Sequence, residues 1–218
     1  MDTTTTIEGI IFDLDGTLVN SIEDIADSMN FVLQQENYPE HSYEAHASFI
    51  GGGIRNLVSK AVPSGSTSEI IDRCFELMLA HYSENCTNKT ALYEGIEILL
   101  ELLDSKEIPM AVLSNKADAL TKKVAQEKLP NLFKQVKGMT TEALKKPNPE
   151  VVLKMCQDLK LDPKKTFYVG DTAVDVETAK NAGMISVAVT WGFRSKESLE
   201  KLNPDFIIDS PMNLQDII

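Results

Sequence analysis

Apolar and polar positions along the chain follow two spacings, one typical of strands and the other typical of helices. Short apolar runs rich in β-branched residues predict strands at residues 7–12, 109–115, 135–141, 166–171, 185–192 and 205–209. Apolar residues at helical spacing predict helices at residues 21–36, 43–62, 69–83, 95–108, 117–129, 149–161 and 173–183, with a short helix at the C-terminus.

Strands and helices alternate after about residue 92, and these strands are apolar almost throughout. Such a pattern is typical of a parallel sheet covered by helices on both faces. We therefore expect an α/β fold with a doubly wound, Rossmann-like parallel sheet. The stretch 19–92 is rich in helix formers and contains no convincing strand, which predicts an inserted all-helical cap domain. The α/β core is then expected to comprise residues 1–18 and 93–218.

Polar side chains gather where three predicted strands end and on one connecting loop. In chain order they are Asp13, Asp15, Thr17, Ser114, Asn115, Lys116, Lys145, Lys146, Asp171, Thr172 and Asp175. Ligands of doubly wound sheets bind outside the carboxyl ends of the strands, so these side chains are expected to meet there. A single aspartate at such a position is more often a helix N-cap. Four separate sites at successive positions favour a functional interpretation.

Crowded carboxylates need a partner that offsets their repulsion. At an effective dielectric constant of about 20, two like charges about 4 Å apart repel by about 4 kcal/mol. A hard divalent cation such as Mg²⁺ compensates for this repulsion, and it also binds substrate phosphate. One aspartate can then act as a nucleophile that forms an aspartyl-phosphate, while a second carboxyl transfers protons. The twelve-residue calcium loop of EF-hands is absent from the sequence.

Composition narrows the range of partners. The formal net charge is -12, which disfavours binding to nucleic acid and to anionic membrane surfaces. No apolar run approaches the length of a membrane helix, and residues 2–6 are expected to form a short exposed lead-in rather than a secretory signal. Cys74, Cys86 and Cys156 form no C-x-x-C pair, which favours free thiols and a cytoplasmic location.

Four ordered motifs resemble those of the haloacid dehalogenase-like hydrolase superfamily. They are DLDGT at 13–17, VLSNK at 112–116, KKPNP at 145–149 and GDTAVD at 170–175. The resemblance spans nearly the whole chain, including a helical cap inserted between the first and second motifs. Within the superfamily the chain most resembles the phosphoglycolate phosphatase-like branch, on the stretches DLDGTLVNS, FIGGGIRNLVSKAV and KPNPEVVL.

The resemblance implies roles for the first motif and its partner after a later strand. Asp13 is implied as the nucleophile and, with Asp171, as a Mg²⁺ ligand. Asp15 is implied as the general acid and base, and as a metal ligand through its backbone carbonyl. Thr17 is implied to orient Asp15 and the phosphoryl group. Dehalogenases of this superfamily lack the second aspartate and use no metal, so the presence of Asp15 favours phosphate chemistry.

The remaining motifs are implied to hold the phosphoryl group and the metal shell. Ser114, with Asn115 beside it, would bind the transferring phosphoryl group, and Lys146 would pair with Asp13 and the phosphate. Asp175 would orient the water shell of the metal or a neighbouring group. The chain departs from related phosphatases at Asn20, where aspartate is common, and we expect this change to affect the hinge or cap.

A glycine-rich stretch in the predicted cap suggests a substrate loop. Backbone N–H groups around Gly52 and Gly53 can approach an anion, and Arg55 can then meet a substrate carboxylate or second phosphate. The alternative interpretation is a flexible turn that begins a helix. Residues 19–21 and the region near Leu92 are the expected hinges for cap closure.

The leading hypothesis is a Mg²⁺-dependent phosphomonoesterase that acts on a small phosphorylated metabolite such as 2-phosphoglycolate. One alternative is a β-phosphoglucomutase-like sugar phosphomutase, which would return the phosphoryl group to the sugar. Another is a signalling module in which Asp13 is a long-lived phosphorylated switch, although such a module needs no cap. We expect a monomer or homodimer, with no nucleic acid or membrane partner.

Overall fold

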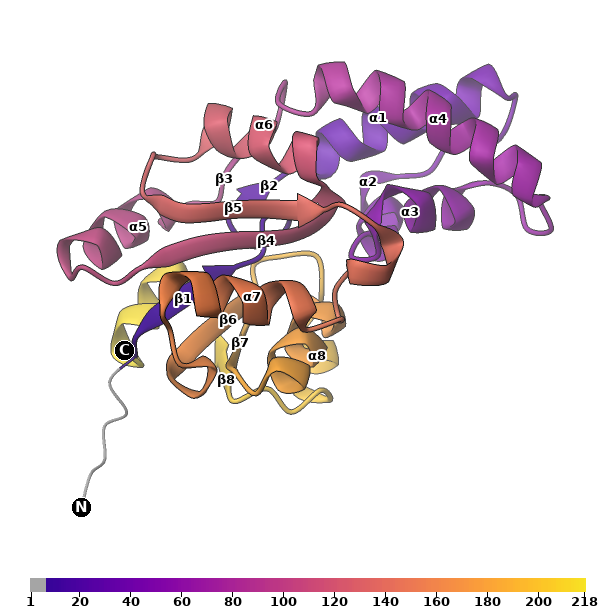
Figure 1. The fold of residues 1–218 in the computed structure, drawn as a ribbon. Helices are drawn as coiled ribbons and strands as arrows, with labels where there is room; N and C mark the ends of the chain where they lie inside the picture. Colours follow the sequence, from indigo (N-terminus) through magenta and orange to yellow (C-terminus); the bar gives the residue numbers. More distant parts are fainter. Residues whose placement is uncertain (1–6) are drawn as a thin grey trace.

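The computed structural model describes residues 7–218, so the predicted lead-in at residues 2–6 lies outside the described part of the chain. Six parallel strands form one sheet in the order β5-β4-β1-β6-β7-β8, and a block of helices extends beyond its edge (Figure 1). The strands are β1 (Gly9–Phe12), β4 (Met110–Ala117), β5 (Phe133–Met139), β6 (Thr166–Gly170), β7 (Ile185–Val189) and β8 (Phe206–Ile208). This confirms the predicted α/β class.

Strand β1 lies in the middle of the sheet. It pairs with β4, with Ile10 opposite Met110, and with β6, with Phe12 opposite Val169. Because all three strands run in the same direction, their carboxyl ends meet at one edge of the sheet. This register brings the residues that follow β1, β4 and β6 together, although the three strands lie far apart in sequence.

Helices cover both faces of the sheet, because successive strand residues point to opposite sides. Ile10 and Phe12 lie in the hydrophobic cluster that includes residues of α5 and α6, whereas Ile11 packs with α7 and α8. The core helices are α5 (Ile96–Ser105), α6 (Asp118–Lys128), α7 (Glu150–Leu159), α8 (Ala173–Ala182) and α9 (Lys196–Glu200). Short 3-10 helices occur at η1 (Glu142–Leu144), η2 (Pro163–Lys165) and η3 (Pro211–Asp216), the last where a C-terminal helix was predicted.

The inserted block contains four helices, and it corrects one predicted element. They are α1 (Ile22–Gln35), α2 (Tyr43–Phe49), α3 (Gly53–Ala61) and α4 (Ser68–Asn85). The continuous helical pattern predicted over 43–62 is divided between α2 and α3. Ile50 is extended, with ψ 156°, and Gly51 has φ 118°, a backbone conformation that favours glycine. The apolar spacing was correct, but the glycines interrupt the helix.

Two very short strands join the block to the core. β2 (Val19–Asn20) and β3 (Ala91–Leu92) pair in antiparallel fashion, with Val19 opposite Leu92. The expectation of no strand within 19–92 was therefore wrong at both ends of that stretch, because two residues are too few to show a strand period. The predicted domain boundaries fall at this pair.

Two expectations from composition concern cysteines and membrane helices. Cys74, Cys86 and Cys156 are free thiols, and all three are buried. Among the helices formed by residues 7–218, none combines the length and apolar character needed to cross a bilayer. The free-thiol prediction is confirmed.

Asp24, in the first turn of α1, binds the segment at Lys89 and Thr90 through which the chain leaves the inserted block. Its buried carboxylate accepts hydrogen bonds from the backbone N–H groups of Lys89, at 2.9 Å, and Thr90, at 2.8 Å. The hydroxyl of Thr90 donates a third bond at 2.7 Å. These bonds fix the chain just before it enters β3.

Replacing Asp24 should destabilise the fold far more than replacing its exposed neighbour. Asp24→Ala removes the acceptor of two backbone N–H groups and one of the two hydrogen bonds of the Thr90 hydroxyl, so we expect a loss of about 2–3 kcal/mol in the free energy of unfolding. Glu23→Ala, in the same helical turn, should change it by less than about 0.5 kcal/mol. Urea unfolding of both variants measures the difference, and equal effects would contradict this role of Asp24.

His46 makes the stability of the block dependent on pH. Burial, together with the nearby His41, lowers the pKa of His46 from 6.5 to about 4, and Asp27 opposes the shift. The unfolded chain therefore binds more protons than the folded one between these values, so stability should fall as the pH falls from about 6.5 towards 4. His46→Gln should flatten this decline in urea unfolding, whereas His81→Gln should retain it; an unchanged slope in His46→Gln would contradict the assignment.

Candidate active site

A small cavity lies between the carboxyl edge of the sheet and the inserted helices. Its core lining consists of Asp13, Asp15, Ser114, Asn115, Lys116, Lys146 and Thr172. Its cap lining consists of Ile25, Ile50, Gly51, Gly53, Ile54, Leu57 and Tyr82. The free volume is about 50 Å³, which is room for only a few water molecules. The polar side chains predicted to meet thus surround a space suited to a small ligand.

The turn after β1 separates its two aspartates. Leu14 O accepts hydrogen bonds from Leu18 N and Val19 N, each at 3.0 Å, so the chain reverses directly after Asp13. Gly16, with φ 88°, takes a conformation that favours glycine, and a side chain there would collide with the Asp171 carboxylate. Asp13 and Asp15 consequently have different lysine partners.

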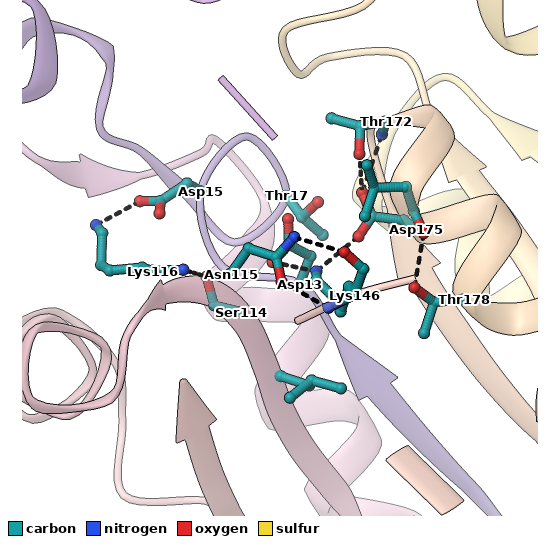
Figure 2. A network of polar contacts seen from close by, with 12 residues as sticks. Asp13, Asp15, Thr17, Ser114, Asn115, Lys116, Lys146, Thr172, Asp175 and Thr178 are labelled. Carbon is teal, nitrogen blue, oxygen red and sulfur yellow. Dashed lines mark hydrogen bonds and ion pairs between the residues drawn. The ribbon is translucent and has the colours of Figure 1, made fainter. Parts of the chain in front are cut away.

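Lys146 lies between two aspartates on one side of this cluster (Figure 2). Its Nζ is 2.9 Å from Asp13 Oδ1 and 2.7 Å from Asp175 Oδ1. Burial alone would lower the pKa of Lys146, but the charges of Asp13 and Asp175 raise that pKa well above its usual value. Lys146 is therefore a fixed cation beside Asp13.

Lys116 forms an ion pair with Asp15 on the other side of Asp13 (Figure 2). Its buried Nζ is 2.6 Å from Asp15 Oδ1 and 5.2 Å from the centre of the Tyr82 ring. Burial opposes its charge, but the Asp15 carboxylate keeps the pKa of Lys116 above its usual value. Lys116 is the last residue of the second motif, and no role was predicted for it. Its position at the end of a predicted strand is the sequence feature that could have indicated a place in the site.

Three buried carboxylates approach closely enough to hold a metal ion. Oxygen atoms of Asp13, Asp171 and Asp175 all lie within 4.8 Å of one another. Burial, opposed by Lys146, raises the pKa of Asp13 to about 7. Burial and the neighbouring aspartates raise the pKa of Asp171 well above its usual value. Both shifts mean that ionising these carboxylates is unfavourable here, chiefly because they are buried and also because other aspartates lie beside them.

The network as a whole has a deficit of positive charge. Asp13, Asp15, Asp171 and Asp175 are all buried, and two buried lysines face them. When every group is ionised, two negative charges remain. A divalent cation matches that remainder in charge, and carboxylate oxygens are the ligands that such hard cations prefer. The residues present therefore fit a divalent metal ion.

Ser114 and Asn115 both follow β4, but their side chains are engaged differently. Ser114 Oγ accepts a hydrogen bond from Lys116 N at 3.1 Å, which leaves its hydroxyl hydrogen free to donate into the cavity. Asn115 Nδ2 donates to Gly51 O at 3.0 Å and to Lys146 O at 3.1 Å. Its Oδ1 accepts from Lys146 N at 2.8 Å. The Asn115 side chain thus positions the lysine loop and the cap, with no amide hydrogen left for phosphate.

Asp175 and Thr17 act on neighbouring protein groups. Asp175 Oδ2 accepts bonds from the backbone N–H and hydroxyl of Thr172, at 3.0 and 2.6 Å, in a capping box that begins α8. Thr17 Oγ1 lies 3.4 Å from Asp171 Oδ1, so it contacts the carboxylate of Asp171 rather than that of Asp15. Asp171 Oδ2 also accepts a bond from Phe193 N at 2.7 Å.

The predicted cap residues divide into two groups. Gly53 lines the cavity, as does Gly51, whereas Gly52 and Arg55 are not part of the lining. Arg55 instead forms an ion pair with Asp72 on the exposed face of the block. The structure thus brings the glycine loop to the site but leaves the arginine outside it.

Contacts from the core hold the inserted block over the cavity. Arg194 Nη1 donates to Ala47 O at 2.7 Å, and Nη2 donates to Ile50 O at 2.6 Å, at the C-terminal end of α2. Lys123 Nζ donates to Ser83 O at 2.8 Å. Sequence reasoning missed these contacts, because backbone carbonyls give no sequence signal for the side chains that reach them.

Comparison with known proteins gives a consistent family. The model of the haloacid dehalogenase-like hydrolase family matches residues 10–189. A phosphoglycolate phosphatase of Aquifex aeolicus is 36% identical over 206 residues, covering 94% of this chain and 93% of that protein. A phosphoglycolate phosphatase of Chromobacterium violaceum is 31% identical, covering 97% and 96%. A solved structure of a predicted phosphoglycolate phosphatase from Haemophilus somnus superposes with a TM-score of 0.90, at 29% identity, covering 100% of this chain and 99% of that one.

Metal binding should stabilise the fold through Asp171. At about 100 times its Kd, a bound ion adds about 2.7 kcal/mol to the free energy of unfolding, so MgCl₂ should raise the unfolding temperature by several degrees. Because the pKa of Asp13 is about 7 without metal, the shift should be larger at about pH 8 than at about pH 6.

Differential scanning fluorimetry measures this shift in matched variants. Asp171→Asn should remove most of it, whereas Asp209→Asn, at an exposed aspartate paired with Lys196, should retain it. An equal shift in wild type and Asp171→Asn would exclude Asp171 as a ligand.

Proposed function

This chain belongs to the haloacid dehalogenase-like hydrolase family, in its phosphoglycolate phosphatase-like branch, and is a phosphatase; we propose that it hydrolyses 2-phosphoglycolate with Mg²⁺ through an aspartyl-phosphate intermediate. The family and the phosphatase activity predicted from the sequence are thereby confirmed. One observation carries the proposal: Asp13 lines a small cavity, with a fixed cation 2.9 Å from its carboxylate and the carboxylates of Asp171 and Asp175 beside it.

Asp13 is the nucleophile in the proposed reaction. One of its carboxylate oxygens attacks the phosphorus atom, the bond between phosphorus and the leaving oxygen breaks, and an aspartyl-phosphate forms. Lys146, already in contact with Asp13, neutralises charge that develops on the phosphoryl oxygens. Ser114 can donate its free hydroxyl hydrogen to one of the same oxygens.

Asp15 transfers the protons. It protonates the leaving oxygen, so that glycolate leaves with a neutral hydroxyl group. It then takes a proton from the water molecule that attacks phosphorus. The bond between phosphorus and Asp13 breaks, which releases inorganic phosphate and restores the Asp13 carboxylate. In this role Asp15 exchanges its contact with Lys116 for one with the leaving oxygen.

Asp13 and Asp171 would hold the Mg²⁺ ion, together with the backbone carbonyl of Asp15. When bound, the ion stabilises negative charge on the phosphoryl group. Asp175 positions Lys146 beside Asp13 through their 2.7 Å ion pair and fixes the start of α8. Thr17 helps to orient Asp171.

We also propose that residues 19–92 act as a cap that closes over the bound substrate, with the paired strands β2 and β3 as its hinge. The cavity supports this, because half of its lining comes from the block and its volume is small. Closure excludes water from the aspartyl-phosphate until the leaving group has departed.

Asp13→Asn should abolish turnover. The amide is a poor nucleophile, so we expect phosphate release from 2-phosphoglycolate to fall by about 10³-fold or more. Asp118→Asn changes an aspartate near the same sheet edge that instead accepts a bond from Gly138 N, and it should keep at least about half of the activity. Steady-state phosphate release decides; substantial activity in Asp13→Asn would remove the nucleophile assignment.

A substrate screen separates this proposal from the two alternatives. Phosphate release should be measured with 2-phosphoglycolate, sugar phosphates, nucleotides and pyrophosphate, with and without Mg²⁺. Fast Mg²⁺-dependent release from 2-phosphoglycolate supports the proposal. Interconversion of sugar phosphate isomers without net release would indicate a mutase, and a phosphoprotein that persists for many minutes would indicate a signalling switch.

A further inference from the structure

A tyrosine of the inserted block presents a buried hydroxyl at the cavity. Tyr82, on α4, is fully buried and lines the cavity with the catalytic residues. Among residues 7–218, its hydroxyl oxygen makes no hydrogen bond of standard geometry, and Lys116 is a side chain that interacts with it. A buried hydroxyl without a well-formed hydrogen bond loses the free energy of its bonds to water, so a ligand group that accepts its hydrogen would be favoured there.

Lys116 lies beside Tyr82 with unused hydrogen-bonding capacity. Its ammonium group carries three N–H donors; Asp15 Oδ1 accepts one of them and the Tyr82 hydroxyl also interacts with the group, so at least one donor remains for a ligand. The Nζ is 5.2 Å from the centre of the Tyr82 ring, so the two side chains are neighbours. Together they offer a cation and a hydroxyl to the same part of the cavity.

The surrounding lining makes this polar pair selective. Ile25, Ile54 and Leu57 supply apolar surface from the block, so few other groups there can bind a charged ligand atom. Pockets of this type use apolar walls for contact and a few polar groups for orientation. The free volume of about 50 Å³ favours a short leaving group over a sugar or a nucleoside.

We propose that Lys116 and Tyr82 form the subsite that binds the carboxylate of a short phosphorylated hydroxy acid. The inference rests on the proposed phosphatase function and names the groups that select the leaving group. Lys116 provides the opposite charge, and the Tyr82 hydroxyl donates a hydrogen bond to the second carboxylate oxygen. In this proposal Lys116 and Tyr82, rather than Arg55 as predicted from the sequence, determine which leaving group is selected.

The test compares two substrates that differ in the carboxylate alone. Ethyl phosphate replaces the carboxylate of 2-phosphoglycolate with a methyl group. Wild type should prefer 2-phosphoglycolate, and the ratio of the two kcat/KM values should fall by about 10–100-fold in Tyr82→Phe, mainly through KM. Tyr43→Phe removes a different cap hydroxyl, one bonded to Asp27 on the surface, and should leave the ratio as in wild type.

Lys116→Met provides a second, independent variant. Because Lys116 also contacts Asp15, this change should slow both substrates, but the ratio should still fall by about tenfold or more. Wild-type preference for ethyl phosphate, or an unchanged ratio in folded Tyr82→Phe and Lys116→Met, would overturn the subsite. Failure of wild type to hydrolyse either substrate or p-nitrophenyl phosphate would instead overturn the proposed function itself.

Discussion

The site depends on charge compensation between two buried lysines and four buried aspartates at the carboxyl edge of the sheet. Each lysine has separate partners: Lys146 holds Asp13 and Asp175, and Lys116 holds Asp15. This division gives two carboxylates of one short turn different surroundings, so that they can take different chemical roles. Compensation is incomplete, and the residual negative charge fits the cluster to hold a divalent cation.

The same contacts connect the inserted block to the chemistry. Asn115 bonds to Gly51 in the block and to both backbone groups of Lys146, so one side chain links the glycine loop to the cation beside Asp13. Arg194 fixes the end of α2 from the core side. The position of the block and the placement of the charged groups are therefore parts of a single hydrogen-bonded arrangement.

Sequence patterns predicted the sheet and its polar edge because long apolar strands and motif residues leave a strong local signal. The same patterns missed β2 and β3, which are too short to have a period, and the break at Gly51, where backbone conformation overrides apolar spacing. They also could not distinguish Tyr82 from an ordinary core residue, because apolar residues at helical spacing indicate only that a side chain is buried. Whether a buried side chain faces a cavity depends on tertiary contacts across the two parts of the chain.

The central position of β1 has a consequence for how the protein forms. β1 precedes both of its neighbours in the chain, so it can pair with β4 only after synthesis has passed Met110 and with β6 only after synthesis has passed Thr166. Contacts at such long separation slow folding, because long loops must close before the strands gain any bonds. Until β4 and β6 have been synthesised, the apolar residues of β1 have no strand to pair with. The strand that leads into Asp13 is therefore open to mispairing until those partners have been made.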